Sequence, residues 1–116
     1  MSDSGRHGAM FRILAMLPEA SRARMARMYC ESLQQLLPEL GDAVEGAREE
    51  ETRALAHKVA GAAAMLQDER LAALARRIEE LILAAQAADA YALWPAAQAA
   101  AGESLAALAA VYPPLQ

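Results

Sequence analysis

The sequence has few of the residues that build β-sheets, disulfides or membrane spans. Only 4% of its 116 residues are aromatic, and β-branched residues are scarce as well, which argues against a sheet. The single cysteine, Cys30, excludes an internal disulfide, suits a reducing cytoplasm, and is expected to be a small core residue. There is no signal-peptide pattern and no unbroken apolar run long enough to cross a membrane.

Positive charge is also in short supply. Eleven basic residues face fifteen acidic ones, and the net charge of -4 disfavours non-specific binding to nucleic acid. The densest basic stretch, with Arg22, Arg24 and Arg27, is interleaved with Met and Ala. It is expected to be a solvated helix face.

Alanine and a helical periodicity of apolar residues dominate what is present. Residues 1–8 are predicted to be a disordered leader in which His7 has no partner, and residues 9–17 a short helix. A long helix is expected from Pro18 and Glu19 to about Gly46, because proline suits a first helical turn. Pro38 inside it predicts either a kink or a break into two helices.

Three further helices are predicted along the remaining chain. One begins in the acidic run 49–51 and ends near Leu66, and the next follows Asp68, which is expected to cap it. After a soft region around Asp89, a last helix extends to about Val111 and is stopped by the prolines at 113 and 114. Pro95 lies in its first turn or kinks it. The fold class is therefore all-α, an antiparallel four-helix bundle with a short extra N-terminal helix, forming one domain over residues 9–116.

The stretch Ala56–Leu66, AHKVAGAAAML, carries the candidate functional residue. On a helical wheel, the apolar residues Leu55, Val59, Ala62 and Leu66 form the expected buried stripe. His57 falls on the opposite, outward face. The residues expected to share that face are Glu50, Arg53, Ala60, Gly61, Ala64 and Asp68.

The neighbours of His57 on this face are unusually small. Helical side chains lean toward the N-terminus, so Ala60 and Gly61 leave the imidazole uncovered, and with Ala64 they form a smooth surface. A glycine inside a helix lowers its stability by about 1 kcal/mol relative to alanine, so the presence of Gly61 needs an explanation. The alternative is that one exposed histidine in an alanine-rich helix has no function. No second ligand at metal spacing, no paired Ser or Cys nucleophile and no phosphate-binding loop accompanies His57, so no metal is expected.

These residues resemble the histidine-containing phosphotransfer (HPt) domain family. The resemblance rests on His57-Lys58-Val59-Ala60-Gly61-Ala62-Ala63, preceded by Leu55-Ala56 and followed by Arg70-Leu71-Ala72 and a glutamate-bearing segment, Ile78-Glu79-Glu80. It implies a four-helix bundle in which His57 is the phosphoacceptor, Gly61 keeps space beside it, and Leu55 and Val59 belong to the core. Two positions depart from the family pattern: Ala60 stands in place of a lysine and Gln67 in place of a glycine.

The Ala60 departure removes the cation that would accompany a phosphoryl group. A phosphorylated imidazole carries about two negative charges, which a nearby cation stabilises. Arg53 lies one turn N-terminal on the same face, whereas Lys58 lies about 100° around the helix. Arg53, assisted by Lys58, is therefore predicted to take over part of the role of the missing lysine, which is to stabilise the charge of the phosphoryl group.

The resemblance implies a phosphocarrier of a two-component phosphorelay, without an ATP site of its own. His57 would accept a phosphoryl group from a receiver-domain aspartate and pass it to another receiver; free imidazole, which titrates near pH 6.5, suits that role. The expected partners are receiver domains of response regulators and hybrid histidine kinases, which would supply Mg²⁺, while the chain itself needs no cofactor. Glu50, Ala60, Gly61, Ala64 and Asp68 form the expected docking surface.

The alternative is a helical adaptor or kinase-regulating module that uses the same face without phosphorylation. In either case we expect a cytoplasmic monomer that contacts neither nucleic acid nor membrane. Met1 favours a free-standing protein over a domain excised from a hybrid kinase.

Overall fold

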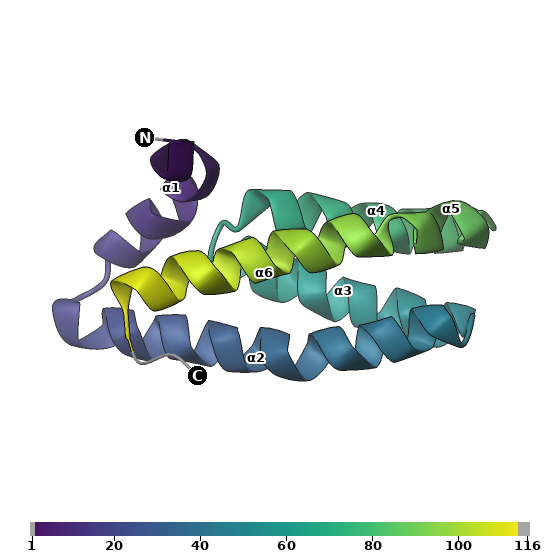
Figure 1. The fold of residues 1–116 in the computed structure, drawn as a ribbon, viewed down its shortest axis with the longest axis horizontal. Helices are drawn as coiled ribbons and strands as arrows, with labels where there is room; N and C mark the ends of the chain where they lie inside the picture. Colours follow the sequence, from purple (N-terminus) through teal and green to yellow (C-terminus); the bar gives the residue numbers. More distant parts are fainter. Residues whose placement is uncertain (1, 114–116) are drawn as a thin grey trace.

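The computed structural model describes residues 2–113, with side chains from residue 6 onward, and this part of the chain contains only helices (Figure 1). The predicted all-α class is confirmed. The helices are α1 (Ser2–Ala15), α2 (Glu19–Glu45), α3 (Glu49–Met65), α4 (Glu69–Leu83), α5 (Ala87–Ala92) and α6 (Trp94–Val111).

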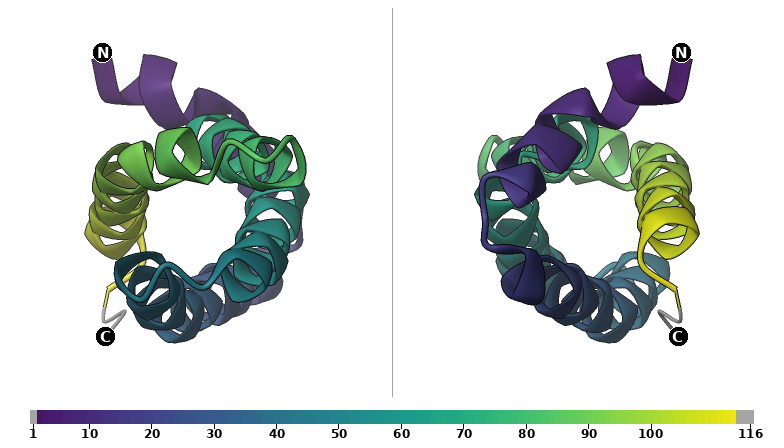
Figure 2. Two further views of the ribbon diagram at one scale, coloured as in Figure 1. Left: turned by 90° about the vertical axis from the view of Figure 1, so that its right-hand side faces the viewer. Right: turned by 90° about the vertical axis from the view of Figure 1, so that its left-hand side faces the viewer.

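The four longest helices, α2, α3, α4 and α6, lie side by side along the length of the molecule (Figure 1). Views along the long axis show α2, α3, α4 and α6 in that order around a common core, with α1 crossing one end (Figure 2). Short α5 lies at the opposite end, where it joins α4 to α6. The site therefore belongs to a helix, α3, that is flanked by α2 and α4.

The helix boundaries follow the sequence signals closely. Pro18 precedes the first turn of α2, and Pro95 lies in the first turn of α6. Helix α2 runs through Pro38 without a break into two helices. The soft region around Asp89 is helical, since it forms α5. Helix α6 ends at Val111, two residues before Pro113, and Pro114 lies outside the described residues.

Three helices end in the same motif, which the sequence does not predict because none of the three residues in the left-handed conformation is a glycine. Ala47, Gln67 and Ala85 have φ of 53°, 55° and 60°, in the left-handed region that favours glycine. The following amides close the turn: Arg48 N bonds Ala43 O, Asp68 N bonds Ala63 O and Gln86 N bonds Leu81 O, all within 2.9 Å. Gln67, where the HPt pattern has glycine, thus occupies a position that a glycine would fill with less strain.

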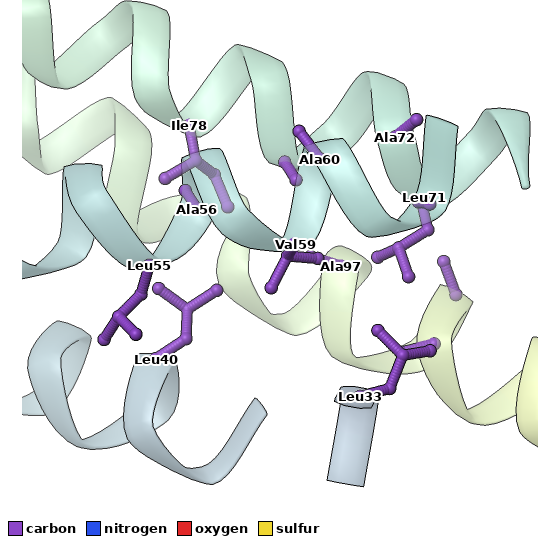
Figure 3. Packing of buried hydrophobic residues seen from close by; sticks show 14 of the residues in the cluster. Leu33, Leu40, Leu55, Ala56, Val59, Ala60, Leu71, Ala72, Ile78 and Ala97 are labelled. Carbon is purple, nitrogen blue, oxygen red and sulfur yellow. The ribbon is translucent and has the colours of Figure 1, made fainter. Parts of the chain in front are cut away.

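Large aliphatic side chains meet between the four longer helices. Figure 3 shows Leu33 and Leu40 of α2 facing Leu55 and Val59 of α3, with Leu71 completing the cluster from α4. Cys30 is buried, as predicted for a core residue, and burial raises the pKa of its thiol. A raised pKa keeps the thiol protonated and unreactive.

The N-terminal segment differs from its prediction. Helix α1 begins at Ser2, so the disordered leader predicted for residues 1–8 is wrong for residues 2–8, while Met1 lies outside the described residues. Arg6 forms an ion pair with Glu103 of α6 at 2.7 Å. His7 is buried, with its Nε2 3.3 Å from Ser104 Oγ. A polar segment can dock when its polar atoms find partners, which local sequence does not reveal.

Asp68 is the centre of that polar contact. Asp68 is 3% exposed, and its carboxylate accepts hydrogen bonds from Tyr29 Oη at 2.5 Å and Ser104 Oγ at 2.9 Å. Burial, and then the charge of Asp68, raise the pKa of Tyr29 far above its ordinary value, so the phenol remains a donor. Since the Ser104 hydroxyl donates to Asp68, His7 Nε2–H donates to Ser104.

Two predictions about Asp68 are therefore wrong. Asp68 stands at the N-cap position of α4, but its side chain makes no capping hydrogen bond because it points inward. It is also absent from the surface that was expected to dock a partner, since the carboxylate is buried. Instead, its hydrogen bonds join α2 and α6, and through Ser104 also α1, to the α3–α4 connection.

We predict that Asp68→Ala lowers the free energy of unfolding by about 2–4 kcal/mol, because it leaves Tyr29 Oη buried without its acceptor and leaves Ser104 Oγ only its longer hydrogen bond to the Ala100 carbonyl oxygen. Urea unfolding followed by circular dichroism measures the change. Glu69→Ala is the matched control, because its carboxylate is exposed and its loss is expected to change stability by less than about 0.5 kcal/mol. Equal effects of the two substitutions would contradict this role.

Candidate functional site

His57 projects from the outer side of α3 toward solvent, as predicted. Its side chain is 69% exposed, and its Nδ1 lies 3.0 Å from Glu79 Oε2 on α4. Glu79 is much less exposed, at 18%. A fixed carboxylate therefore holds one nitrogen of a ring whose remainder is accessible.

This contact determines which nitrogen is nucleophilic. An ionised carboxylate can only accept a hydrogen bond, so Nδ1 of His57 carries the proton that Glu79 accepts. In the neutral ring the lone pair then belongs to Nε2. The arrangement matches the orientation of a catalytic imidazole by a carboxylate on the opposite nitrogen.

Alanine residues bring α3 and α4 close together below this pair. Ala56, Ala60 and Ala63 of α3 and Ala72 and Ala75 of α4 are all at most 5% exposed, and we call these five residues the alanine seam. Figure 3 shows Ala56 and Ala60 on the side of α3 that faces α4. Small side chains allow the close helix contact that lets Glu79 reach across to His57.

The prediction that Ala60 lies on the outward face is wrong. Its side chain is 5% exposed and belongs to the alanine seam. The larger apolar residues of α3 pack toward α2 and the core, and they alone define the stripe on a helical wheel. Helix α3 also buries a second side against α4, where alanine carries the contact. Ala62, expected in the core, is only half-buried as a result.

The residues of the expected docking surface differ in their exposure. Gly61, Ala64 and Glu50 are exposed as predicted, whereas Ala60 and Asp68 are not. A Cβ built on Gly61 would meet no atom within 4 Å. Gly61 is therefore not required by helix packing, and the surface beside His57 is open.

The two predicted cations differ in their surroundings. Arg53 binds Glu50 through Nη2 at 2.5 Å and Nε at 3.1 Å, and its Nη1 lies 3.7 Å from Glu79. The hydrogen bond between them lowers the pKa of Glu50 and raises that of Arg53. Lys58 is exposed and forms no ion pair with residues 6–113. Arg53 and His57 thus share Glu79.

Glu79 is the site residue that the sequence did not identify. In the sequence it belongs only to the segment Ile78-Glu79-Glu80 of the family resemblance, which gives it no role. Glu79 can be identified only when the register between α3 and α4 is known, because that register places position 79 opposite position 57. That register depends on how the two helices pack, and a single helix pattern does not contain it.

The described residues offer no other obvious chemistry. Residues 2–113 contain no group of three His, Cys, Asp or Glu side chains able to hold a metal ion. The helices described are also too short or too polar to span a bilayer. What the site presents is one oriented, nucleophilic imidazole nitrogen beside a low, open surface.

We predict that Glu79→Ala changes the tautomer of neutral His57. Nitrogen-15 spectra of the imidazole should show Nδ1–H as the major form in the wild type, and a shift toward Nε2–H in the variant. Glu80→Ala provides the control, because Glu80 contacts Arg77 rather than His57. The same tautomer in the wild type and in Glu79→Ala would rule out this role for Glu79.

Gly61→Ala should stabilise the fold. Nothing obstructs a Cβ at this position, so the variant gains helix propensity of up to about 1 kcal/mol. Thermal or urea unfolding tests this, with Ala64→Gly expected to change stability in the opposite direction. A loss of stability in Gly61→Ala would show that packing, rather than accessibility of the ring, requires the glycine.

A comparison with known protein families finds a match over the segment that carries this site. A family model described as Hpt domain matches residues 24–111, which extend from α2 to the end of α6. No curated protein and no solved structure matches the chain.

Proposed function

The chain belongs to the Hpt domain family, and we propose that it is a histidine phosphocarrier in a two-component phosphorelay, with His57 as the phosphoacceptor. The observation that carries the proposal is the geometry of His57. Its Nδ1 is held by Glu79, the remainder of the ring is accessible, and the neighbouring α3 residues Gly61 and Ala64 are small and exposed.

The transfer step follows from that geometry. The Nε2 lone pair of His57 attacks the phosphorus of an aspartyl phosphate on a receiver domain. An N–P bond forms, the P–O bond to the aspartate breaks, and the aspartate leaves as a carboxylate. Nδ1 keeps its proton throughout, and Glu79 stabilises the positive charge that develops on the ring. The reverse step on a second receiver completes the relay.

The partner supplies what this chain does not provide. Mg²⁺ and the acidic groups that bind it belong to the receiver domain of a response regulator or hybrid histidine kinase, and the carrier needs no cofactor or ATP site. The open surface at Gly61 and Ala64, with Glu50 at one edge, forms the docking surface. Ala60 supports it from below, as part of the alanine seam.

Arg53 and Lys58 assist the phosphoryl group in this proposal. Arg53 lies one helical turn from His57 but is engaged by Glu50 and Glu79, so its charge is already partly balanced. A phosphoryl group on Nε2 would compete with these carboxylates for the guanidinium. Lys58 has no such competitor within residues 6–113, but it starts from the adjacent side of the helix.

The remaining expectations complete the proposed picture. The arrangement of α2, α3, α4 and α6 supports an antiparallel four-helix bundle, with α1 as the extra N-terminal helix. We propose that residues 9–116 act as a single domain and that the protein is a cytoplasmic monomer. Its partner is a receiver domain rather than nucleic acid or a membrane.

We predict that a phosphorylated receiver domain transfers label to the wild type and not to His57→Gln. The label should be acid-labile and stable to alkali, as an N–P bond is. The chain has two histidines, so His7→Gln is the matched control and should retain the label. Circular dichroism establishes that each variant is folded.

Label that persists on His57→Gln would assign the acceptor elsewhere. A wild type that takes no label from several phosphorylated receivers, yet binds them, would favour the alternative function. That alternative is an HPt-like adaptor that occupies receivers or kinases without phosphorylation. The observation in its favour is Ala60, since the position that carries the family's lysine is here an alanine buried against α4.

A further inference from the structure

Arg76 of α4 is a cation on the phosphoryl-accepting face that neither the sequence pattern nor the family match assigns. It is exposed, and within residues 6–113 it forms no ion pair, unlike its neighbour Arg77, which lies 3.5 Å from Glu80. It lines a shallow groove between α3 and α4 together with Ala64, Gln67, Glu69 and Ala72. An unpaired guanidinium therefore lies on the same face of the molecule as His57.

Two contacts fix the register between α3 and α4. His57 lies opposite Glu79, and Ala64 shares its groove with Ala72, so residue numbers rise on one helix as they fall on the other. Midway between these contacts, Arg76 lies across from Ala60 and Gly61. It is three residues from Glu79, which corresponds to about 4.5 Å along the helix axis.

The surface between Arg76 and His57 is low. Ala60 is buried in the alanine seam, and a Cβ at Gly61 would meet nothing within 4 Å. Helical side chains lean toward the N-terminus, so Arg76 rests beside Ala72 and Ala64, away from His57. Neither an ion pair within the described residues nor a bulky neighbour on α3 holds it there.

We propose that Arg76 binds the phosphoryl group on His57, moving across Gly61 to do so, and that it takes over the role of the missing lysine at position 60. This inference rests on the proposed function. Arginine suits the task because its planar fork donates two hydrogen bonds to phosphate oxygens. Arg53 is less available for it, since two carboxylates already engage its guanidinium.

The proposal also gives a second reason for a glycine at position 61. A side chain larger than alanine at this position would stand between Arg76 and His57, whereas glycine leaves the route open. The helix accepts a residue of poor propensity at this point because the phosphoryl group must be reached from α4. The cation then comes from the neighbouring helix instead of from α3 itself.

The test uses the full chain phosphorylated by phosphoramidate, a small donor that needs no receiver. Nε2 attacks phosphorus, the donor's P–N bond breaks and ammonia leaves. Phosphorus-31 spectra recorded against pH give the protonation midpoint of the phosphoryl group in the wild type, Arg76→Ala and Arg76→Lys. Arg77→Ala is the matched control, one residue along the same exposed helix.

We predict that Arg76→Ala raises this midpoint, because a lost cation makes the phosphoryl dianion harder to form. Phosphorylation of His57 should also slow about tenfold, the fold-change expected for one lost charge-assisted hydrogen bond. Arg76→Lys should restore most of both effects, and Arg77→Ala should change neither.

Each other outcome decides something. If His57 takes the phosphoryl group and Arg76→Ala leaves both the midpoint and the rate unchanged, the role of Arg76 is wrong and the phosphocarrier function stands. If Arg77→Ala has the same effect as Arg76→Ala, only the overall charge of α4 matters and the specific contact is wrong. If the wild type takes no phosphoryl group from phosphoramidate or from receivers, the proposed function fails and the inference with it.

Discussion

Close packing of α3 against α4 through the alanine seam is the constraint on which the site depends. Because Ala56, Ala60 and Ala63 are small, the two helix backbones approach closely enough for Glu79 to reach His57. A larger side chain inserted in this contact would strain or separate the helices, at a typical cost of 1–3 kcal/mol. The residue that departs most from the family pattern, Ala60, is therefore also one that holds the site together.

A second constraint acts at the far end of α3. Asp68 lies eleven residues beyond His57, about 16 Å along a helix, and its buried carboxylate is satisfied by Tyr29 and Ser104. Such a network is stable only when all its members are present, because an unpaired buried charge is strongly unfavourable. It fixes the α3–α4 connection even though Gln67 in that turn has a backbone conformation that suits glycine. The register that places Glu79 opposite His57 is thus supported by the alanine seam and by the hydrogen bonds at the α3–α4 connection.

The sequence predicted most of the elements and part of the site. Pro18 and the acidic run at 49–51 gave correct helix starts, because these signals are local, and of the two possibilities for Pro95 the first-turn position is the one observed. The exposure of His57 followed from the apolar periodicity of α3. Contacts between elements did not follow in the same way. Glu79 needs the register of two helices, and the burial of His7 and Asp68 needs partners on α2 and α6. Ala60 was misplaced because alanine is compatible with both a surface and a tight helix contact.

If His57 is the phosphoacceptor, as proposed, the charges around it suit transient rather than permanent phosphorylation. In the resting state, the carboxylate of Glu79 orients the ring and also attracts Arg53. A phosphoryl group on Nε2 would be repelled by that same carboxylate, so the phosphorylated form needs cations brought in from the side. A lysine fixed next to the ring would stabilise the phosphoryl group continuously. In our proposal, Arg76 on α4 would provide the stabilisation only while the phosphoryl group is present, and it would withdraw when a receiver takes the group away.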